Sequence, residues 1–264
     1  MGGMGGVLAL LVGGWLFRQS AAAPFLFGAL GMLAASLVVL ILVREPAQPE
    51  VAEEAPGVLS SLRAVLRDRD RSALLLLGAI FCWFLGYSAI EVFFTSFAVN
   101  ALRLNPGQAT MLLAGFSLSI LIGSVPAGFI GARFGRRRAI LAGLLLFASL
   151  LAWGYTLNAV SLVRVMLVVA GLAWSLVVVN ALPMVLDCAP PDRDGAYTGL
   201  YYLASQLAAV VGPVLAGQTL ALAGNNYRIL FVYAPLTVAV ALVLMLGVRR
   251  GEVLGGSRSV QPRA

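Results

Sequence analysis

Long uninterrupted apolar segments constrain this chain more than any other feature. A helix of about 20 apolar residues crosses the hydrocarbon of a bilayer, and only helices and closed barrels satisfy every backbone group in lipid. Apolar residues make up 61% of the 264 residues and charged residues only 11%. The sequence therefore predicts an all-α integral membrane protein with about eight transmembrane helices. These lie near residues 3–17, 24–43, 73–101, 107–131, 139–158, 161–187, 196–222 and 228–248.

The arginines predict how these helices are oriented. All 18 basic residues are arginine. A cytoplasmic N-terminus puts fourteen of them in inner loops and the tail and leaves four outside, namely Arg18, Arg103, Arg164 and Arg228. Positive charge is retained in the cytoplasm, so both termini are expected there. The net charge of +7 then reflects orientation and contact with anionic lipid, and no nucleic-acid partner is expected. The Arg-rich, lysine-free composition suggests a bacterial inner membrane.

A polar segment divides the chain into parts. We expect residues 1–44 to be the last two helices of an N-terminal domain and residues 45–72 to be a cytoplasmic linker. Apolar residues recur at helical spacing within 58–66, which favours a short amphipathic helix there over a solvated linker. Residues 73–250 would form a six-helix domain, followed by a cytoplasmic tail over 251–264. Parallel six-helix repeats are typical of one large class of secondary transporters.

A basic, glycine-containing turn lies between the fourth and fifth predicted spans, in residues 128–138. It resembles the loop signature of the major facilitator superfamily in its second-domain copy. Matching positions are occupied by Gly128, Arg133, Gly135, Arg136 and Arg137. The resemblance implies a twelve-helix carrier that works by alternating access, of which this chain would hold the last eight helices.

The same turn departs from the family signature at one position. Ala132 stands where the family has an aspartate, so the contact attributed to that acid is not expected here. One hypothesis is a cytoplasmic gate in which Arg136 and Arg137 pair with acids near the next cytoplasmic loop. The candidates are Asp187, Asp192 and Asp194. The alternative is that the arginines contact lipid phosphates and the aspartates are solvated.

Glu91 is the most informative single residue. It lies well inside the third span, where a charged side chain costs on the order of 3 kcal/mol and normally faces a partner or a water-filled cavity. Trp83, Tyr87 and Glu91 are spaced by four and so share one helix face. This pattern indicates a proton-coupling carboxyl group beside aromatic rings that suit a sugar. The alternative is a neutral acid bonded within the bundle, with both aromatic residues in packing roles.

Other polar or aromatic residues inside spans are candidates for the cavity wall. Amides are rare in spanning segments and favour either a substrate or a partner on another helix. The candidates are Trp174, Asn180, Tyr202 and Gln206.

Enzymatic chemistry has no support in the sequence. There is no histidine, no cluster with metal-ligand spacing, no phosphate-binding loop and no nucleophile elbow. We therefore expect neither an enzyme nor a cofactor or metal. Residues 81–95 resemble the sugar-cation and sucrose-type branches of the superfamily, which implies proton-coupled sugar symport. The alternatives are a drug or metabolite efflux carrier and a non-transporting remnant or membrane scaffold.

Overall fold

A computed structural model describes residues 12, 13, 15, 16, 19, 20, 22–42, 62, 63, 65, 71–190 and 193–251. The chain divides into two compact units, residues 1–55 and residues 56–264. The first contains helix α2 (Ala23–Leu42). The second contains α4 (Ser72–Asn100), α5 (Pro106–Phe134), α6 (Arg136–Gly154), α7 (Val160–Asp187), α8 (Asp194–Leu222), the 3-10 turn η1 (Tyr227–Ile229) and α9 (Leu230–Leu246).

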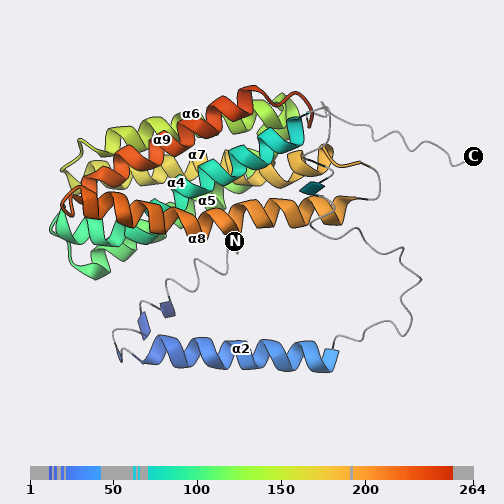
Figure 1. Ribbon diagram of the computed structural model, residues 1–264. Coiled ribbons are helices and arrows are strands. Elements are labelled where there is room, and N and C mark those ends of the chain that lie inside the picture. The colour runs from blue at the N-terminus through green and yellow to red at the C-terminus, as the bar shows by residue number, and fades with distance from the viewer. Residues whose placement is uncertain are drawn as a thin grey trace, which may run out of the picture. The chain divides into compact units, whose positions relative to one another are not determined.

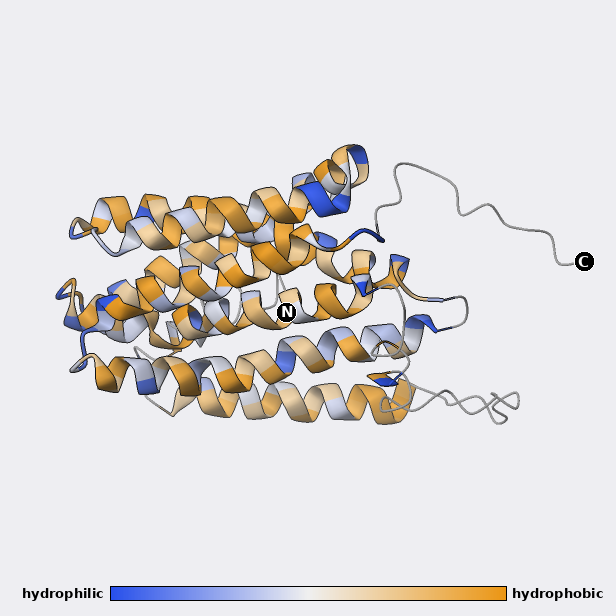
Figure 2. Ribbon diagram, turned by 45° about the horizontal axis from the view of Figure 1, so that its top comes forward, coloured by the Kyte–Doolittle hydropathy of each residue, from blue (hydrophilic) through white to orange (hydrophobic). Residues whose placement is uncertain are grey.

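The helices confirm the predicted fold class. Seven helical segments in the described part of the chain are long and apolar enough to cross a membrane, and no strand occurs among those residues. They match the second to eighth predicted spans within a few residues, while most of residues 3–17 lies outside the described part. Hydrophilic residues gather near the helix ends and apolar residues fill the middles (Figure 2). Many outward side chains are large and apolar, such as Leu145 on α6, which is 61% exposed, and Val243 on α9, which is 68% exposed.

Helices α4 to α9 run side by side as one bundle (Figure 1). Helix α4 packs against α8 and α9, and α7 packs against α5 and α6. The largest fully buried side chains, which include Trp83, Phe147 and Trp174, fill the space between these helices. The six helices therefore share one apolar core.

Local sequence signals set several helix ends. Asn105 caps α5 through a capping box, in which its side chain accepts from the N–H of Gln108 at 2.8 Å and Gln108 accepts from the N–H of Asn105 at 3.2 Å. Gly135 separates α5 from α6 with a φ of 97°, a conformation that glycine adopts without strain. The turn is so tight that α6 begins at Arg136, three residues before the predicted start of that span.

The bundle has two distinct ends. At one end, called the arginine end below, α4, α6 and α8 begin and α5, α7 and α9 finish. There Ser72 Oγ accepts from the N–H groups of Arg249 and Arg250, at 3.1 and 3.2 Å. At the opposite end, the guanidinium group of Arg228 donates to the backbone oxygens of Tyr155 and Leu157, at 2.6 and 3.1 Å. Each end is thus fastened by polar contacts between segments distant in sequence.

The predicted amphipathic helix over 58–66 falls mostly outside the described residues. Residues 62, 63 and 65 are helical, and Val65 is only 1% exposed within the core of the second unit.

Candidate functional site

Tyr87 and Glu91 form a hydrogen-bonded pair near the middle of α4, in the half farther from the arginine end. The Tyr87 hydroxyl donates to Glu91 Oε1 at 3.2 Å. Tyr87 is 6% exposed, whereas Glu91 is exposed. The spacing of four residues puts both side chains on the same helix face, as predicted. A carboxyl group in the middle of a spanning helix is thus accessible on one side and fixed by a phenol on the other.

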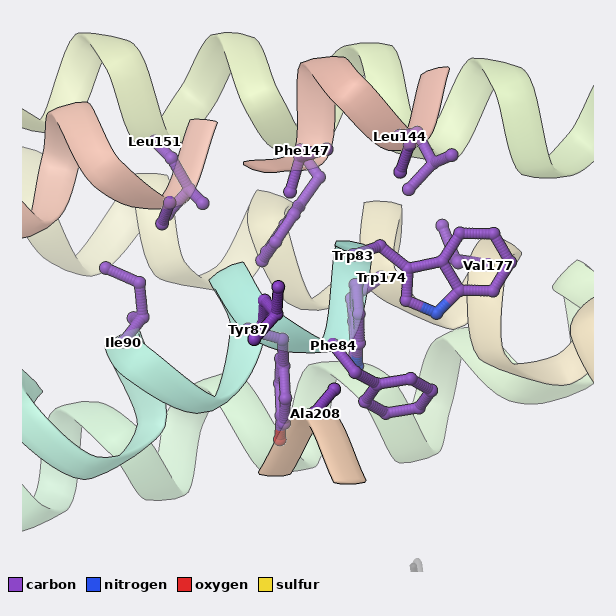
Figure 3. Close-up of a cluster of buried hydrophobic side chains, with 14 of the residues drawn as sticks. Trp83, Phe84, Tyr87, Ile90, Leu144, Phe147, Leu151, Trp174, Val177 and Ala208 are labelled. Atoms are coloured by element: carbon purple, nitrogen blue, oxygen red, sulfur yellow. The ribbon is translucent and has the colours of Figure 1, made fainter. Parts of the chain in front are cut away.

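Aromatic rings from α5 and α7 contact the Tyr87 ring, and a ring from α6 packs behind one of them. The Tyr87 ring stacks on Trp174 of α7, with centroids 4.5 Å apart and planes 2° from parallel. The ring centroid of Phe116 on α5 lies 6.2 Å from that of Tyr87, and the centroid of Phe147 on α6 lies 4.9 Å from that of Trp174. Figure 3 shows Phe84, Tyr87, Phe147 and Trp174 in one cluster inside the bundle. Stacked contacts of this kind fix ring orientation and contribute about 0.5–1.5 kcal/mol each beyond burial.

Trp83 does not share the exposed position of Glu91. Its side chain is 0% exposed and packs against Phe84, with ring centroids 6.5 Å apart. Its indole nitrogen has no hydrogen-bond partner among the described residues. The predicted stripe of Trp83, Tyr87 and Glu91 therefore runs from the core of the bundle to its surface.

Ser88 joins α4 to α8 beside this pair. Its hydroxyl lies 2.7 Å from the Phe84 oxygen on α4 and 3.3 Å from the Ala208 oxygen on α8. Sequence reasoning did not single out this contact, nor the stacking role of Phe116. No local signal marks either residue, because serine and phenylalanine are common in spanning helices.

The α8 candidates lie apart from the hydrogen-bonded pair. Tyr202 is 50% exposed and packs edge-on against Tyr201, with centroids 5.2 Å apart, and Gln206 is exposed. Within the described part of the chain, no hydrogen bond connects Tyr202 or Gln206 with Tyr87 or Glu91. Their side chains are available to a ligand but are not organised around the carboxyl group.

Asn180 is used in helix packing. It is 3% exposed, and its Nδ2 donates to the Ala127 oxygen on α5 at 3.1 Å and to the Leu176 oxygen on α7 at 2.9 Å. Gly131 of α5 lies directly against the Asn180 side chain, where a Cβ would overlap it. Both amide hydrogens thus have acceptors, and the interhelical alternative describes this conformation.

The signature turn supplies contacts within the six-helix bundle. Arg136 forms an ion pair with Asp187, which joins the start of α6 to the end of α7. Arg137 donates from Nε to the Met245 oxygen at 3.3 Å and from a terminal nitrogen to the Leu246 oxygen at 2.9 Å. Those carbonyls belong to the last turn of α9, and the Met245 oxygen also accepts from the N–H of Val248 at 3.2 Å.

The remaining loop candidates are not joined to this network. Arg133 is exposed, with its guanidinium carbon 5.7 Å from the Phe134 ring centroid. A Cβ at Gly128 would make only an ordinary contact with Val179, at 3.8 Å. Asp194 is exposed in the first turn of α8, where a negative charge interacts favourably with the helix dipole. Asp192 lies outside the described residues.

Metal binding has no visible basis in the described part of the chain. No group of three or more His, Cys, Asp or Glu side chains there could hold a metal ion.

Three comparisons relate the chain to known proteins. The family model of the Major Facilitator Superfamily matches residues 92–262, which is more than half of the chain. The gentisate transporter of Corynebacterium glutamicum is 33% identical over 148 residues, covering 54% of this chain and 33% of that protein. The cis,cis-muconate transport protein of Acinetobacter baylyi is 23% identical over 223 residues, covering 81% of this chain and 54% of that protein. The chain thus spans between a third and about half of the length of these relatives.

Solved structures share the fold. A mutant of the peptide transporter POT in complex with sulfate superposes with a TM-score of 0.63 at 19% identity, covering 70% of this chain and 40% of that one. A POT family transporter in complex with 5-aminolevulinic acid gives a TM-score of 0.59 at 19% identity, covering 67% and 38%. At such low identity, these similarities concern the fold alone. The family match, which covers more than half of the chain, shows that the chain belongs to the Major Facilitator Superfamily.

Proposed function

We propose that the protein takes part in secondary active transport of a small organic acid, with Glu91 as the proton-coupling group. The observation that carries this proposal is the Tyr87–Glu91 hydrogen bond, which lies on a spanning helix and whose tyrosine packs against rings from α5 and α7. Carboxyl groups inside spanning segments mark ion and proton pathways, because their placement in the membrane is costly. In transport by alternating access, sites for the substrate and the coupling ion lie near the membrane midplane, so a carboxyl group there can bind the coupling proton.

The names of the two relatives support a carboxylic acid as the substrate. Gentisate and cis,cis-muconate are both unsaturated carboxylates, and each relative is named for one of them. A protonated Glu91 can donate a hydrogen bond to a substrate carboxylate, whereas an ionised Glu91 repels it. The stacked rings of Tyr87 and Trp174 are buried, so they position the hydroxyl group that donates to Glu91 and do not themselves face the substrate. Protonation of Glu91 and binding of the acid substrate then depend on each other.

A sugar is the second candidate substrate. The exposed carboxyl group of Glu91 can form hydrogen bonds with a polyol as well as with an acid, and residues 81–95 resemble the sugar-cation branches. Tyr202 and Gln206, which are exposed on α8, add hydrogen-bonding groups for either class.

Orientation and domain division belong to the same proposal. We place the arginine end of the bundle in the cytoplasm of a bacterial cell, following the charge bias. We assign residues 1–44 to the end of an N-terminal domain, 45–72 to a linker, 73–250 to the C-terminal domain and 251–264 to a tail. A gate that uses Arg136 and Arg137 would have to break the Arg136–Asp187 pair inside that domain.

Uptake into proteoliposomes with an imposed pH gradient tests the proposal. We expect accumulation of gentisate or muconate when the outside is more acidic, and no accumulation without the gradient. In the Glu91→Gln variant, gradient-driven accumulation should fall at least about tenfold, while exchange of substrate between the two sides continues. The matched control Glu91→Asp keeps a carboxyl group and should retain part of the accumulation.

Two results would contradict the proposal. If Glu91→Gln accumulates substrate at the rate of the unmodified protein, the residue does not couple transport to protons. If a panel of sugars is accumulated and both acids are not, the substrate class is the second candidate.

A further inference from the structure

The turn between α5 and α6 carries more positive charge than the bundle neutralises. Of its four arginines, Arg136 pairs with Asp187 and Arg137 bonds to carbonyls of α9. Arg133 and Arg138 are exposed, and neither has an ion-pair partner in the part of the chain that the structure describes. Ala132, the exposed residue directly before Arg133, contributes no acid to the turn. Two guanidinium groups that flank the same turn are therefore available to an external anion.

Large apolar side chains lie on the same corner of the bundle. Phe129 is 72% exposed and Phe134 is 56% exposed, and both belong to the last two turns of α5. The Arg133 guanidinium carbon lies 5.7 Å from the Phe134 ring centroid. Arg133 lies beside an aromatic ring, and Phe129 adds apolar surface one turn deeper along the helix. This arrangement suits the membrane interface, where charged lipid headgroups meet acyl chains.

The acids of the described chain do not offset this charge. At the arginine end the described acidic residues are Asp187 and Asp194. Asp187 is bonded to Arg136, and its side chain is only 12% exposed. Asp194 starts α8, where its charge complements that helix. Among the described residues, no acid therefore neutralises the two arginines of the corner formed by Phe129, Arg133, Phe134 and Arg138, called the arginine corner below.

We propose that the arginine corner binds an anionic phospholipid, with the phosphate between Arg133 and Arg138 and an acyl chain against Phe129 and Phe134. Guanidinium groups donate paired hydrogen bonds to phosphate oxygens, so arginine is better suited to this task than a solvated ammonium group. The spans end at this corner, which puts the two arginines at headgroup depth. The proposal does not depend on which solute is transported.

Native mass spectrometry of the purified protein tests this site. The protein is released from detergent micelles that contain equal amounts of phosphatidylglycerol and phosphatidylcholine, and the ratio of the two retained lipids is measured. We expect the unmodified protein to retain phosphatidylglycerol preferentially. Each of Arg133→Gln and Arg138→Gln should lower that ratio about fivefold, as expected for loss of one arginine near an anionic headgroup.

A matched control separates a site from general charge. Arg164 is an exposed arginine in the second turn of α7, at the opposite end of the bundle. Arg164→Gln removes the same charge, and the ratio should stay unchanged. Melting temperatures of all three variants, measured in the same detergent, show whether each is folded.

Three outcomes would overturn the inference. The first is a folded Arg133→Gln, Arg138→Gln double variant with an unchanged lipid ratio. The second is an equal fall in the Arg164→Gln control, which would indicate a non-specific charge effect. The third is loss of the lipid preference on addition of millimolar inorganic phosphate, which would make the corner a site for a free anion and not for a lipid.

Discussion

Gly131 determines how closely α5 and α7 approach near the arginine end. The Asn180 side chain occupies the space where a Cβ would be, and the same side chain donates to the Ala127 oxygen one turn earlier on α5. The glycine and the amide therefore act together, since a larger residue at 131 would displace the hydrogen-bonded group. Gly128, which belongs to the family signature, has no such close neighbour.

This difference predicts opposite results for two similar variants. Gly131→Ala should destabilise the bundle by about 1–3 kcal/mol, because an added methyl group in a packed interface forces shifts of its neighbours. Gly128→Ala should change stability by less than about 0.5 kcal/mol. Unfolding in mixed micelles, followed by far-ultraviolet circular dichroism, measures both. Equal destabilisation by the two variants would show that close packing at 131 is not the cause.

The Tyr87 side chain combines two separable contributions, a stacked ring and a hydroxyl donor. Tyr87→Phe removes the bond to Glu91 but keeps the ring against Trp174, so we expect a loss of about 1 kcal/mol. Trp174→Ala removes the ring on which Tyr87 stacks and should cost about 3–5 kcal/mol. Denaturant titrations followed by far-ultraviolet circular dichroism, which reports helix content, compare the unfolding free energies of the two variants. If Tyr87→Phe is the more damaging change, the hydroxyl and not the stack holds this site together.

At the scale of whole helices, the Arg136–Asp187 pair joins α6 to α7. The Asp187 side chain is 12% exposed and the Arg136 side chain 31%, so the pair is partly shielded from water. Arg136 is the first residue of α6 and Asp187 is the last residue of α7. The loop that connects these two helices lies at the opposite end of the bundle. The pair therefore fixes the relative position of two helices within one unit.

A double-mutant cycle should detect this connection. We expect Arg136→Gln and Asp187→Asn to show a coupling energy of about 1–3 kcal/mol in equilibrium unfolding. Arg133→Gln combined with Asp187→Asn is the control and should be additive within about 0.5 kcal/mol. A coupling near zero for the first pair would mean that the contact contributes nothing to stability, as for many exposed ion pairs.

Helix positions were predictable to within a few residues, and their ends were less so. The second to eighth spans follow from apolar segment length alone, because membrane thickness sets the number of residues that must be apolar. Helix α6 extends to Arg136 on the polar side, where hydropathy gives no signal. Its start depends on the positive φ of Gly135, which is a property of the turn and not of the apolar segment.

At the scale of the whole molecule, the bundle should present its two ends to opposite sides of the membrane. Arg138 lies at the arginine end, and Asn100 is the last residue of α4 at the opposite end. In a background with Cys82 and Cys188 replaced, Asn100→Cys should react with an impermeant maleimide added to intact cells. Arg138→Cys should react only after the membrane is opened, because positively charged loops stay in the cytoplasm. The reverse labelling pattern would invert the proposed orientation, and labelling of both from outside would contradict the spanning bundle.

The sequence by itself determined the solvent, the helical class, the approximate spans and the family signature of this protein. These depend on segment length and local composition, which hydrocarbon thickness and backbone hydrogen bonding convert into structure without reference to other helices. The tertiary structure decided which polar residues inside the spans are available. Asn180 donates to the Ala127 oxygen, 53 residues earlier in the chain, and is buried between two helices. Glu91 accepts from Tyr87 on its own helix and stays exposed. The partners of a buried side chain come from other helices, so no pattern within one span could separate these two residues.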